Sequence, residues 1–211
     1  MATVHITGVV LAGGEGRRMG RVDKGLQQLR GKPLVSWVIE RLAPQVDELL
    51  VNANRHVEDY ARFGYPVVSD AIGGYAGPLA GLHRALAAAR HPLVATAPCD
   101  SPFLPGNLVE RLLGALERDE AELAIAKTGA QPHPVFCLCR RRVLQSLTAY
   151  LENGGRKIDA WYARLPVVEV AFDDEADAFS NINTLEELSA FERDAASLAA
   201  RPKPHPQIHR G

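Results

Sequence analysis

The amino-acid sequence predicts an α/β fold built around a mainly parallel β-sheet. Short apolar runs rich in β-branched residues recur along the chain, and longer segments with helical periodicity separate them. The chain has 211 residues, of which 46% are hydrophobic, so it can bury one sizeable core but is short for two full domains. We therefore expect a single domain over residues 1–196.

The first half of the chain carries the clearest alternation of strands and helices. An apolar stripe at every fourth position behind a proline predicts an amphipathic helix over residues 33–42. A second helix is predicted to open at Pro78 and to end before Pro92. The predicted strands of this half are residues 4–12, 49–53, 66–69 and 93–97.

The second half has a less regular pattern. A third helix is predicted from about Pro105, and we interpret the elements after it as an insertion that covers one side of the sheet. A capping box formed by Thr184 and Glu187 predicts a last helix to about Ala195, and residues 197–211, with three prolines, are expected to be a disordered tail. The elements between are predicted strands at 123–126, 134–139 and 167–172 and predicted helices at 141–151 and 156–162.

Composition and charge exclude several classes of protein. The formal net charge of −1 gives no overall attraction to nucleic acid or to an acidic membrane, so any anion site must be local. The start of the chain lacks a basic leader region, and no apolar run approaches the ~20 residues that span a membrane. Three sparse cysteines indicate a reducing compartment, and we expect a cytoplasmic protein.

A glycine-rich turn directly follows the first predicted strand. Its sequence, LAGGEGRRMGRVDKG over residues 11–25, stands where an open α/β sheet presents ligands, at the carboxyl edge of its strands. Glycines let main-chain N–H groups approach phosphate oxygens without an intervening side chain. Between Gly13 and Lys24, four cationic residues against two acidic ones leave a local positive charge that suits a triphosphate.

Spacing excludes two other phosphate-binding motifs at this turn. A Walker loop needs Lys followed by Ser or Thr directly after its last glycine, and no such pair occurs here. A dinucleotide-binding fingerprint needs Gly or Ala where Met19 stands. Taken alone, the turn is also compatible with a solvated glycine loop that carries surface arginines.

Asp100 is a second candidate for the same edge of the sheet. It follows the predicted strand at 93–97, and its carboxylate is a hard oxygen ligand of the kind that Mg²⁺ accepts. An Asp after a buried strand can also simply tighten a turn.

Taken together, these motifs resemble the GT-A-like nucleotidyltransferases, and the Asp-Lys-Gly ending of the glycine-rich turn is similar to the molybdenum cofactor guanylyltransferase branch. Later segments resemble the same family in the same order, so the likeness spans about residues 6–195. Leu185 departs from the proline that the resemblance leads us to expect, and residues 144–173 match least well. The segments are 11–25, 51–55 (VNANR), 77–81 (GPLAG), 98–103 (PCDSPF) and 181–184 (NINT).

The resemblance implies a three-layer α/β/α, Rossmann-like fold and a Mg²⁺-dependent transfer of GMP from GTP to the terminal phosphate of the molybdenum-pterin cofactor. Cofactor-insertion proteins or molybdoenzyme chaperones are implied partners. The implied residues are Leu11, Ala12, Gly13 and Gly14 at the nucleotide, Asn52 and Asp70 at the guanosine, Arg18 and Lys24 at the phosphates, Asp100 at Mg²⁺, and Arg156, Asn181 and Asn183 on the acceptor side.

Other interpretations remain open. Asp70, Asn181 and Asn183 could be turn residues, and Arg156 could be a solvated charge. His133, between two prolines, could contact the acceptor or be structural, whereas Cys137 and Cys139 fit ordinary strand residues better than a metal site. At the level of function, a cytidylyltransferase on the same pterin, a sugar-phosphate nucleotidyltransferase and a non-catalytic nucleotide-binding module compete with the guanylyltransferase.

Overall fold

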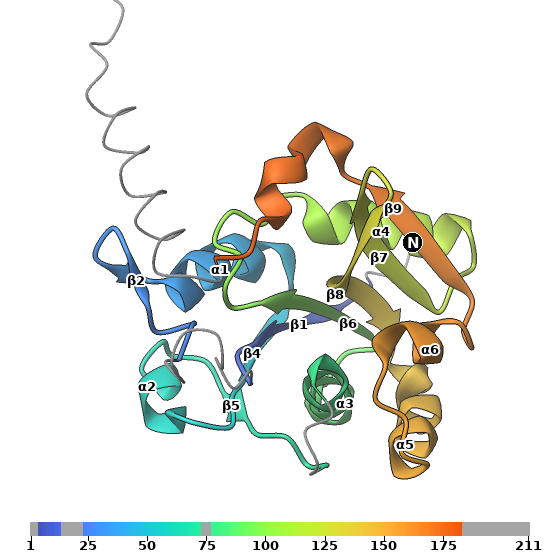
Figure 1. Ribbon diagram of the computed structural model, residues 1–211, viewed down its shortest axis with the longest axis horizontal. Coiled ribbons are helices and arrows are strands. Elements are labelled where there is room, and N and C mark those ends of the chain that lie inside the picture. Colours follow the sequence, from blue (N-terminus) through green and yellow to red (C-terminus); the bar gives the residue numbers. More distant parts are fainter. Residues whose placement is uncertain (1–3, 14–22, 73–76, 183–211) are drawn as a thin grey trace, which may run out of the picture.

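The computed structural model describes residues 4–13, 23–72 and 77–182 and shows a mixed sheet between two layers of helices (Figure 1). The seven-stranded sheet has the order β5-β4-β1-β6-β8-β7-β9, and only β8 runs antiparallel to its neighbours. This arrangement confirms the predicted three-layer α/β fold with a mainly parallel sheet. The strands are β1 (Ile6–Leu11), β4 (Glu48–Asn52), β5 (Val67–Val68), β6 (Leu93–Pro98), β7 (Leu123–Thr128), β8 (Gln131–Arg140) and β9 (Val167–Ala171).

The central strands are buried because they are apolar on both faces. In β1, Val10 packs into the hydrophobic cluster on one face of the sheet, and its neighbour Val9 packs into the cluster on the other face. Such continuous apolar runs suit parallel strands that are covered on both sides. The sheet thus holds β1, β4 and β6 in a fixed register, with their carboxyl ends at one edge.

The helices cover the two faces unequally (Figure 1). Buried residues of α1 and α4 pack on one face together with η4, and those of α3, α5 and α6 pack on the other face. None of the helices in the described ranges is long and apolar enough to cross a membrane. The helices are α1 (Leu34–Leu42), α2 (Val57–Ala61), α3 (Pro78–Ala88), α4 (Leu108–Arg118), α5 (Leu144–Glu152) and α6 (Ile158–Tyr162), with 3₁₀ turns η2 (Ala43–Gln45), η3 (Arg141–Val143) and η4 (Asp173–Phe179).

The second half of the chain corrects one prediction. The elements after α4 were expected to be an insertion covering one side of the sheet, but β7, β8 and β9 extend the sheet itself. Only α5 and α6 cover a face, where they lie with α3. The physical reason is that β8 pairs directly with β6, which places the later strands in line with the earlier ones.

Two small elements were not predicted. The hairpin of β2 (Gln28–Leu29) and β3 (Lys32–Pro33) turns through Arg30 and Gly31, which both have positive φ, as the preferred two-residue hairpin turn requires. The short helix α2 has one buried residue, Tyr60. The predicted helix from Thr184 and the predicted tail over 197–211 lie outside the described residues, and the single domain over 1–196 stays a prediction.

Candidate active site at the carboxyl edge of the sheet

The predicted site residues that the structure describes gather mainly where β1, β4 and β6 end. The backbone N–H of Ala12 donates to the carbonyl of Asn52 (2.8 Å), and that of Cys99 donates to the carbonyl of Leu11 (3.1 Å). These bonds continue the sheet ladder past the strand ends, so the segments that follow are held side by side. Gly14 and Arg18 of the predicted site lie outside the described residues.

Lys24 and Asp100 form an ion pair at this edge. Lys24 Nζ lies 3.1 Å from Asp100 Oδ2, and the two side chains are 23% and 12% exposed. Asp100 follows the end of β6, whereas Lys24 comes from the segment before the β2–β3 hairpin. The structure therefore brings together the cation and the carboxylate that the sequence assigns to the phosphates and to Mg²⁺.

Asn52 and Asp70 meet on the β4 side of the same edge. Asn52 Nδ2 donates to Asp70 Oδ1 (2.9 Å) and to the carbonyl of Val68 (3.1 Å). Asn54 completes this arrangement: its Nδ2 donates to Asp70 Oδ2 (2.8 Å), and its Oδ1 accepts from the N–H of Asp70 (2.9 Å). Both carboxylate oxygens of Asp70 are thus oriented by side-chain amides.

Two glycines permit the close approach of backbone to Asn52. A Cβ on Gly13 would lie 3.2 Å from Asn52 Oδ1 and 3.0 Å from Asn54 Nδ2. A Cβ on Gly81 of α3 would lie only 2.6 Å from Asn52 Oδ1 and 3.0 Å from Leu11 Cδ2. Any side chain at position 81 would therefore push against the Asn52 amide, which is why this turn of α3 needs glycine.

Of the predicted acceptor-side residues, Asn181 lies near Asp100. Ser101 Oγ donates to Asn181 Oδ1 (2.5 Å), and the N–H of Ile182 donates to the carbonyl of Asp100 (2.9 Å). Asn183 lies outside the described residues. Arg156 instead closes the end of α5, because its Nη1 donates to the carbonyl oxygens of Leu151 (2.9 Å) and Gly155 (2.6 Å).

His133 and the two strand cysteines have structural surroundings. His133 stacks on Phe179 with ring centroids 4.9 Å apart, its Nε2 lies 2.8 Å from Thr128 Oγ1, and burial lowers its pKa. Cys137 and Cys139 are buried free thiols of β8, as expected for ordinary strand residues. These contacts favour the structural interpretation of all three residues.

The sequence missed three contributors to this edge. Asn54 and Asp23 stand in quoted segments but received no role, and Tyr60 was not singled out. Tyr60 OH donates to Asp23 Oδ1 (2.5 Å), and Asp23 Oδ1 also accepts from the N–H of Gly25 (3.1 Å). No periodicity connects these residues, so only the folded chain reveals the contact.

The donor set suits a metal ion that is shared with a substrate. In residues 4–13, 23–72 and 77–182, no three His, Cys, Asp or Glu side chains converge as a metal cage would require. Mg²⁺, however, is usually bound by one or two carboxylates together with substrate phosphates and waters. Asp100, a single carboxylate at the carboxyl edge of the sheet beside Lys24, fits that mode.

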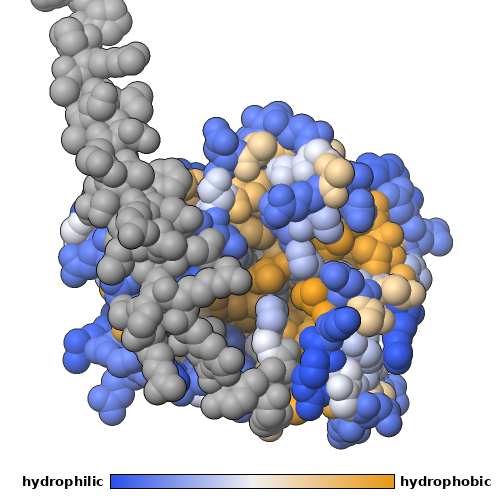
Figure 2. All heavy atoms as spheres, viewed as in Figure 1, coloured by the Kyte–Doolittle hydropathy of each residue, from blue (hydrophilic) through white to orange (hydrophobic). Residues whose placement is uncertain are grey.

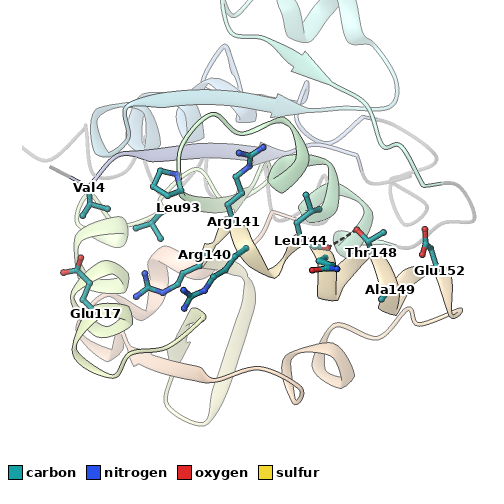
Figure 3. A pocket seen from close by; sticks show the side chains of 12 residues that line it. Val4, Leu93, Glu117, Arg140, Arg141, Leu144, Thr148, Ala149 and Glu152 are labelled. Carbon is teal, nitrogen blue, oxygen red and sulfur yellow. Dashed lines mark hydrogen bonds between the residues drawn. The ribbon is translucent and has the colours of Figure 1, made fainter. Parts of the chain in front are cut away.

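The described face around the site is hollowed between the helix layers, and apolar side chains line the bottom of the hollow (Figure 2). A separate open groove of about 1080 Å³ lies at the opposite edge of the sheet, between Leu93, Arg140 and α5 (Figure 3). It contains none of the predicted site residues. We therefore do not assign the active site to this groove, despite its large volume.

A mainly parallel sheet with a lysine–aspartate pair and an Asn–Asp cluster at its carboxyl edge is the arrangement of a nucleotide-binding α/β protein. Residues 8–167 match the family described as the MobA-like NTP transferase domain. The chain belongs to this family, in its molybdenum cofactor guanylyltransferase branch.

Relatives and a solved structure agree with this assignment. Molybdenum cofactor guanylyltransferases from Cupriavidus taiwanensis and Shewanella putrefaciens are 52% and 47% identical to the chain. The two alignments cover 91% and 90% of the chain, and 98% of each relative. The crystal structure of molybdopterin-guanine dinucleotide biosynthesis protein A from Archaeoglobus fulgidus has a TM-score of 0.75 at 27% identity, covering 90% of this chain and 99% of that one.

Proposed function

We propose that this protein transfers GMP from GTP to the terminal phosphate of the molybdenum-pterin cofactor and releases pyrophosphate. An oxygen of the acceptor phosphate forms a bond to the α-phosphorus of GTP, and the bond from that phosphorus to the bridging oxygen breaks, so that its electron pair leaves with pyrophosphate. The observation that carries the proposal is the Lys24–Asp100 pair at the carboxyl edge of the sheet, in a chain that is 52% identical to a guanylyltransferase.

The residues divide the work as the chemistry requires. Lys24 and Arg18 neutralise charge on the phosphates, Leu11, Ala12, Gly13 and Gly14 bind the nucleotide, and Asn52 and Asp70 hold the guanosine. Asp100 would hold Mg²⁺, which would neutralise charge on the phosphate oxygens. Asn181, whose Oδ1 accepts from Ser101 Oγ on the residue after Asp100, is assigned to the acceptor by resemblance. Asn183 and Arg156 are assigned to the acceptor by resemblance alone.

The setting of the reaction follows from the same assignment. The substrates are small molecules, and no nucleic acid or membrane takes part. The three cysteines are free and buried in the structure, which supports a reducing, cytoplasmic location. Cofactor-insertion proteins or molybdoenzyme chaperones receive the product.

The test is pyrophosphate release by the purified protein with Mg²⁺ and the molybdenum-loaded pterin, comparing GTP, CTP, ATP and UTP and identifying the product by mass. We expect turnover confined to GTP and a guanylylated pterin. Preference for CTP would assign the protein to pterin cytidylyl transfer instead. Nucleotide binding without turnover by folded protein would support a non-catalytic binding module or another acceptor, such as a sugar phosphate.

A further inference from the structure

Tyr60 is a fully buried tyrosine that reaches the phosphate side of the site from a distant helix. It is the one buried residue of α2, and its hydroxyl lies 2.5 Å from Asp23 Oδ1. Burial, together with the nearby thiol of Cys99 and the carboxyl of Asp23, raises the pKa of Tyr60 well above its usual value. The hydroxyl therefore keeps its proton and acts as the donor in this bond.

Asp23 passes this contact on to Lys24. The oxygen that accepts from Tyr60 also accepts from the N–H of Gly25 (3.1 Å), which closes an Asx-type turn around Lys24. The carbonyl of Lys24 in turn accepts from the N–H of Gln27 (3.1 Å). The backbone of Lys24 is therefore fixed on both sides, and its long side chain starts from a defined place.

Gly25 shows how closely this turn is packed. A Cβ at position 25 would lie 2.4 Å from the Tyr60 hydroxyl and 3.2 Å from Cys99 Sγ. Cys99 directly precedes Asp100, so the turn that carries Lys24 rests between α2 and the residue next to the metal carboxylate. The distance between Lys24 and Asp100 is thus set by the packing at Tyr60 and Gly25.

We propose that Tyr60 is a positioning residue of the transfer reaction, which acts by holding Asp23 and thereby fixes Lys24 beside Asp100 and the substrate phosphates. This inference rests on the proposed function. A purely structural Tyr60 would stabilise the fold without any particular connection to Lys24. The two roles differ in one respect: a positioning role disappears when the Lys24 side chain is removed.

The test is a double-mutant cycle on Tyr60 and Lys24. Y60F keeps the ring and removes only the hydroxyl, and we expect kcat/KM for GTP to fall about tenfold, as for loss of one hydrogen bond to a charged group. In a K24A background, the same change should cost less than about twofold. An equal, additive loss in both backgrounds, or no loss in Y60F, would overturn the proposal.

Y162F is the matched control. Tyr162 is also a buried tyrosine, and its hydroxyl donates to the carbonyl of Pro134 at 2.6 Å, away from Lys24. Its melting temperature should fall about as much as that of Y60F, while kcat/KM stays within about twofold of wild type. If Y162F lost as much activity as Y60F, general loosening of the fold would explain both variants, and the positioning role would be rejected.

A binding measurement separates this proposal from the proposed function. Calorimetry with GTP and with guanosine should show that Y60F weakens GTP binding and leaves guanosine binding unchanged. If wild-type protein binds GTP but releases no pyrophosphate, the proposed transfer is wrong. The positioning of Lys24 can still be tested in that case by comparing the GTP affinities of Y60F and wild type. Equal affinities of Y60F and wild type for GTP would overturn the positioning role of Tyr60.

D23A is the second variant if Y60F folds poorly. It removes the acceptor of the same hydrogen bond, and Asp23 is only half-buried, so we expect the same results.

Discussion

Lys24 Nζ and Asp100 Oδ2 lie 3.1 Å apart although 76 positions separate the two residues in the sequence. Both side chains remain partly accessible, so a ligand can reach them. A lysine that rests on a carboxylate can exchange this partner for a phosphate oxygen, while the carboxylate turns to a metal ion. Each charge of the pair thus has a partner before a ligand binds, which avoids the desolvation free energy of an unpaired buried charge.

We expect Asp100→Asn to lower turnover by about a hundredfold or more, because removal of one electrostatic group from such a site usually costs that much. The variant should still fold at the assay temperature, because Asn has nearly the size of Asp and the Lys24 side chain that loses its partner is 23% exposed. Pyrophosphate release and thermal unfolding measure the two effects. A fall in melting temperature large enough to unfold the variant at the assay temperature would contradict this separation.

Gly81→Ala should raise KM for GTP severalfold and destabilise the fold by about 1–3 kcal/mol, because its Cβ would stand 2.6 Å from Asn52 Oδ1. Gly114→Ala is the control: it lies in α4, and its Cβ would meet nothing within 4 Å. This variant should gain about 0.5–1 kcal/mol from helix propensity and keep its KM. Similar behaviour of both variants would show that the close approach at Gly81 does not matter.

Asn54→Ala should raise KM for GTP about three- to tenfold and change kcat little, because Asp70 would lose one of its two orienting amides. Asn107→Ala provides the comparison, since Asn107 precedes α4 and its side chain makes no capping hydrogen bond. Steady-state kinetics at varied GTP separates the two parameters. An unchanged KM in Asn54→Ala would remove Asn54 from the nucleoside side.

Glu48 should make stability depend on pH in the acid range. Burial alone would raise its pKa, but hydrogen bonds from Thr7 Oγ1 and from the amide and guanidinium of Arg90 hold the pKa below the usual 4.5. Its contribution is therefore complete above pH 4.5 and is lost as the pH falls further. Urea unfolding at pH 6 and at about pH 3.5 should show a smaller acid loss in Glu48→Gln than in wild type. Glu117→Gln, on the exposed side of α4, should lose as much as wild type.

The sequence predicted those parts of the site that a strand end determines. Asp100 and Gly13 each follow an apolar run, and the strand direction alone places them at the carboxyl edge, whereas Asn52 was assigned by resemblance. The amphipathic stripes of α1, α3 and α4 likewise predicted which helices cover the sheet, because burial of an apolar face leaves little choice.

The remaining features depend on contacts that have no sequence period. α2 spans five residues, too few for a helical pattern, so its Tyr60 could not be connected with Asp23. The hydrogen bond from Asn54 Nδ2 to Asp70 Oδ2 joins the side chains of two residues that are 16 positions apart in the sequence. The prediction of an insertion was wrong because the apolar pattern of residues 123–126 and 134–139 is the same for strands that extend a sheet and for strands that cover it. The pairing of β8 with β6 distinguishes the two arrangements, and strand pairing cannot be predicted from periodicity.

The reversed direction of β8 has a structural consequence. β8 starts at the carboxyl edge, so the turn before it lies beside the end of β6. The register shift between β8 and β7, at Ile125 and Ala126, lies there too, and Thr96 Oγ1 of β6 donates to the carbonyl of Val135. Residues can be added to or removed from this hairpin without altering the register of β1, β4 and β6. The rim that this hairpin forms can therefore change in length while the segments that hold Asn52 and Asp100 keep their places in the sheet.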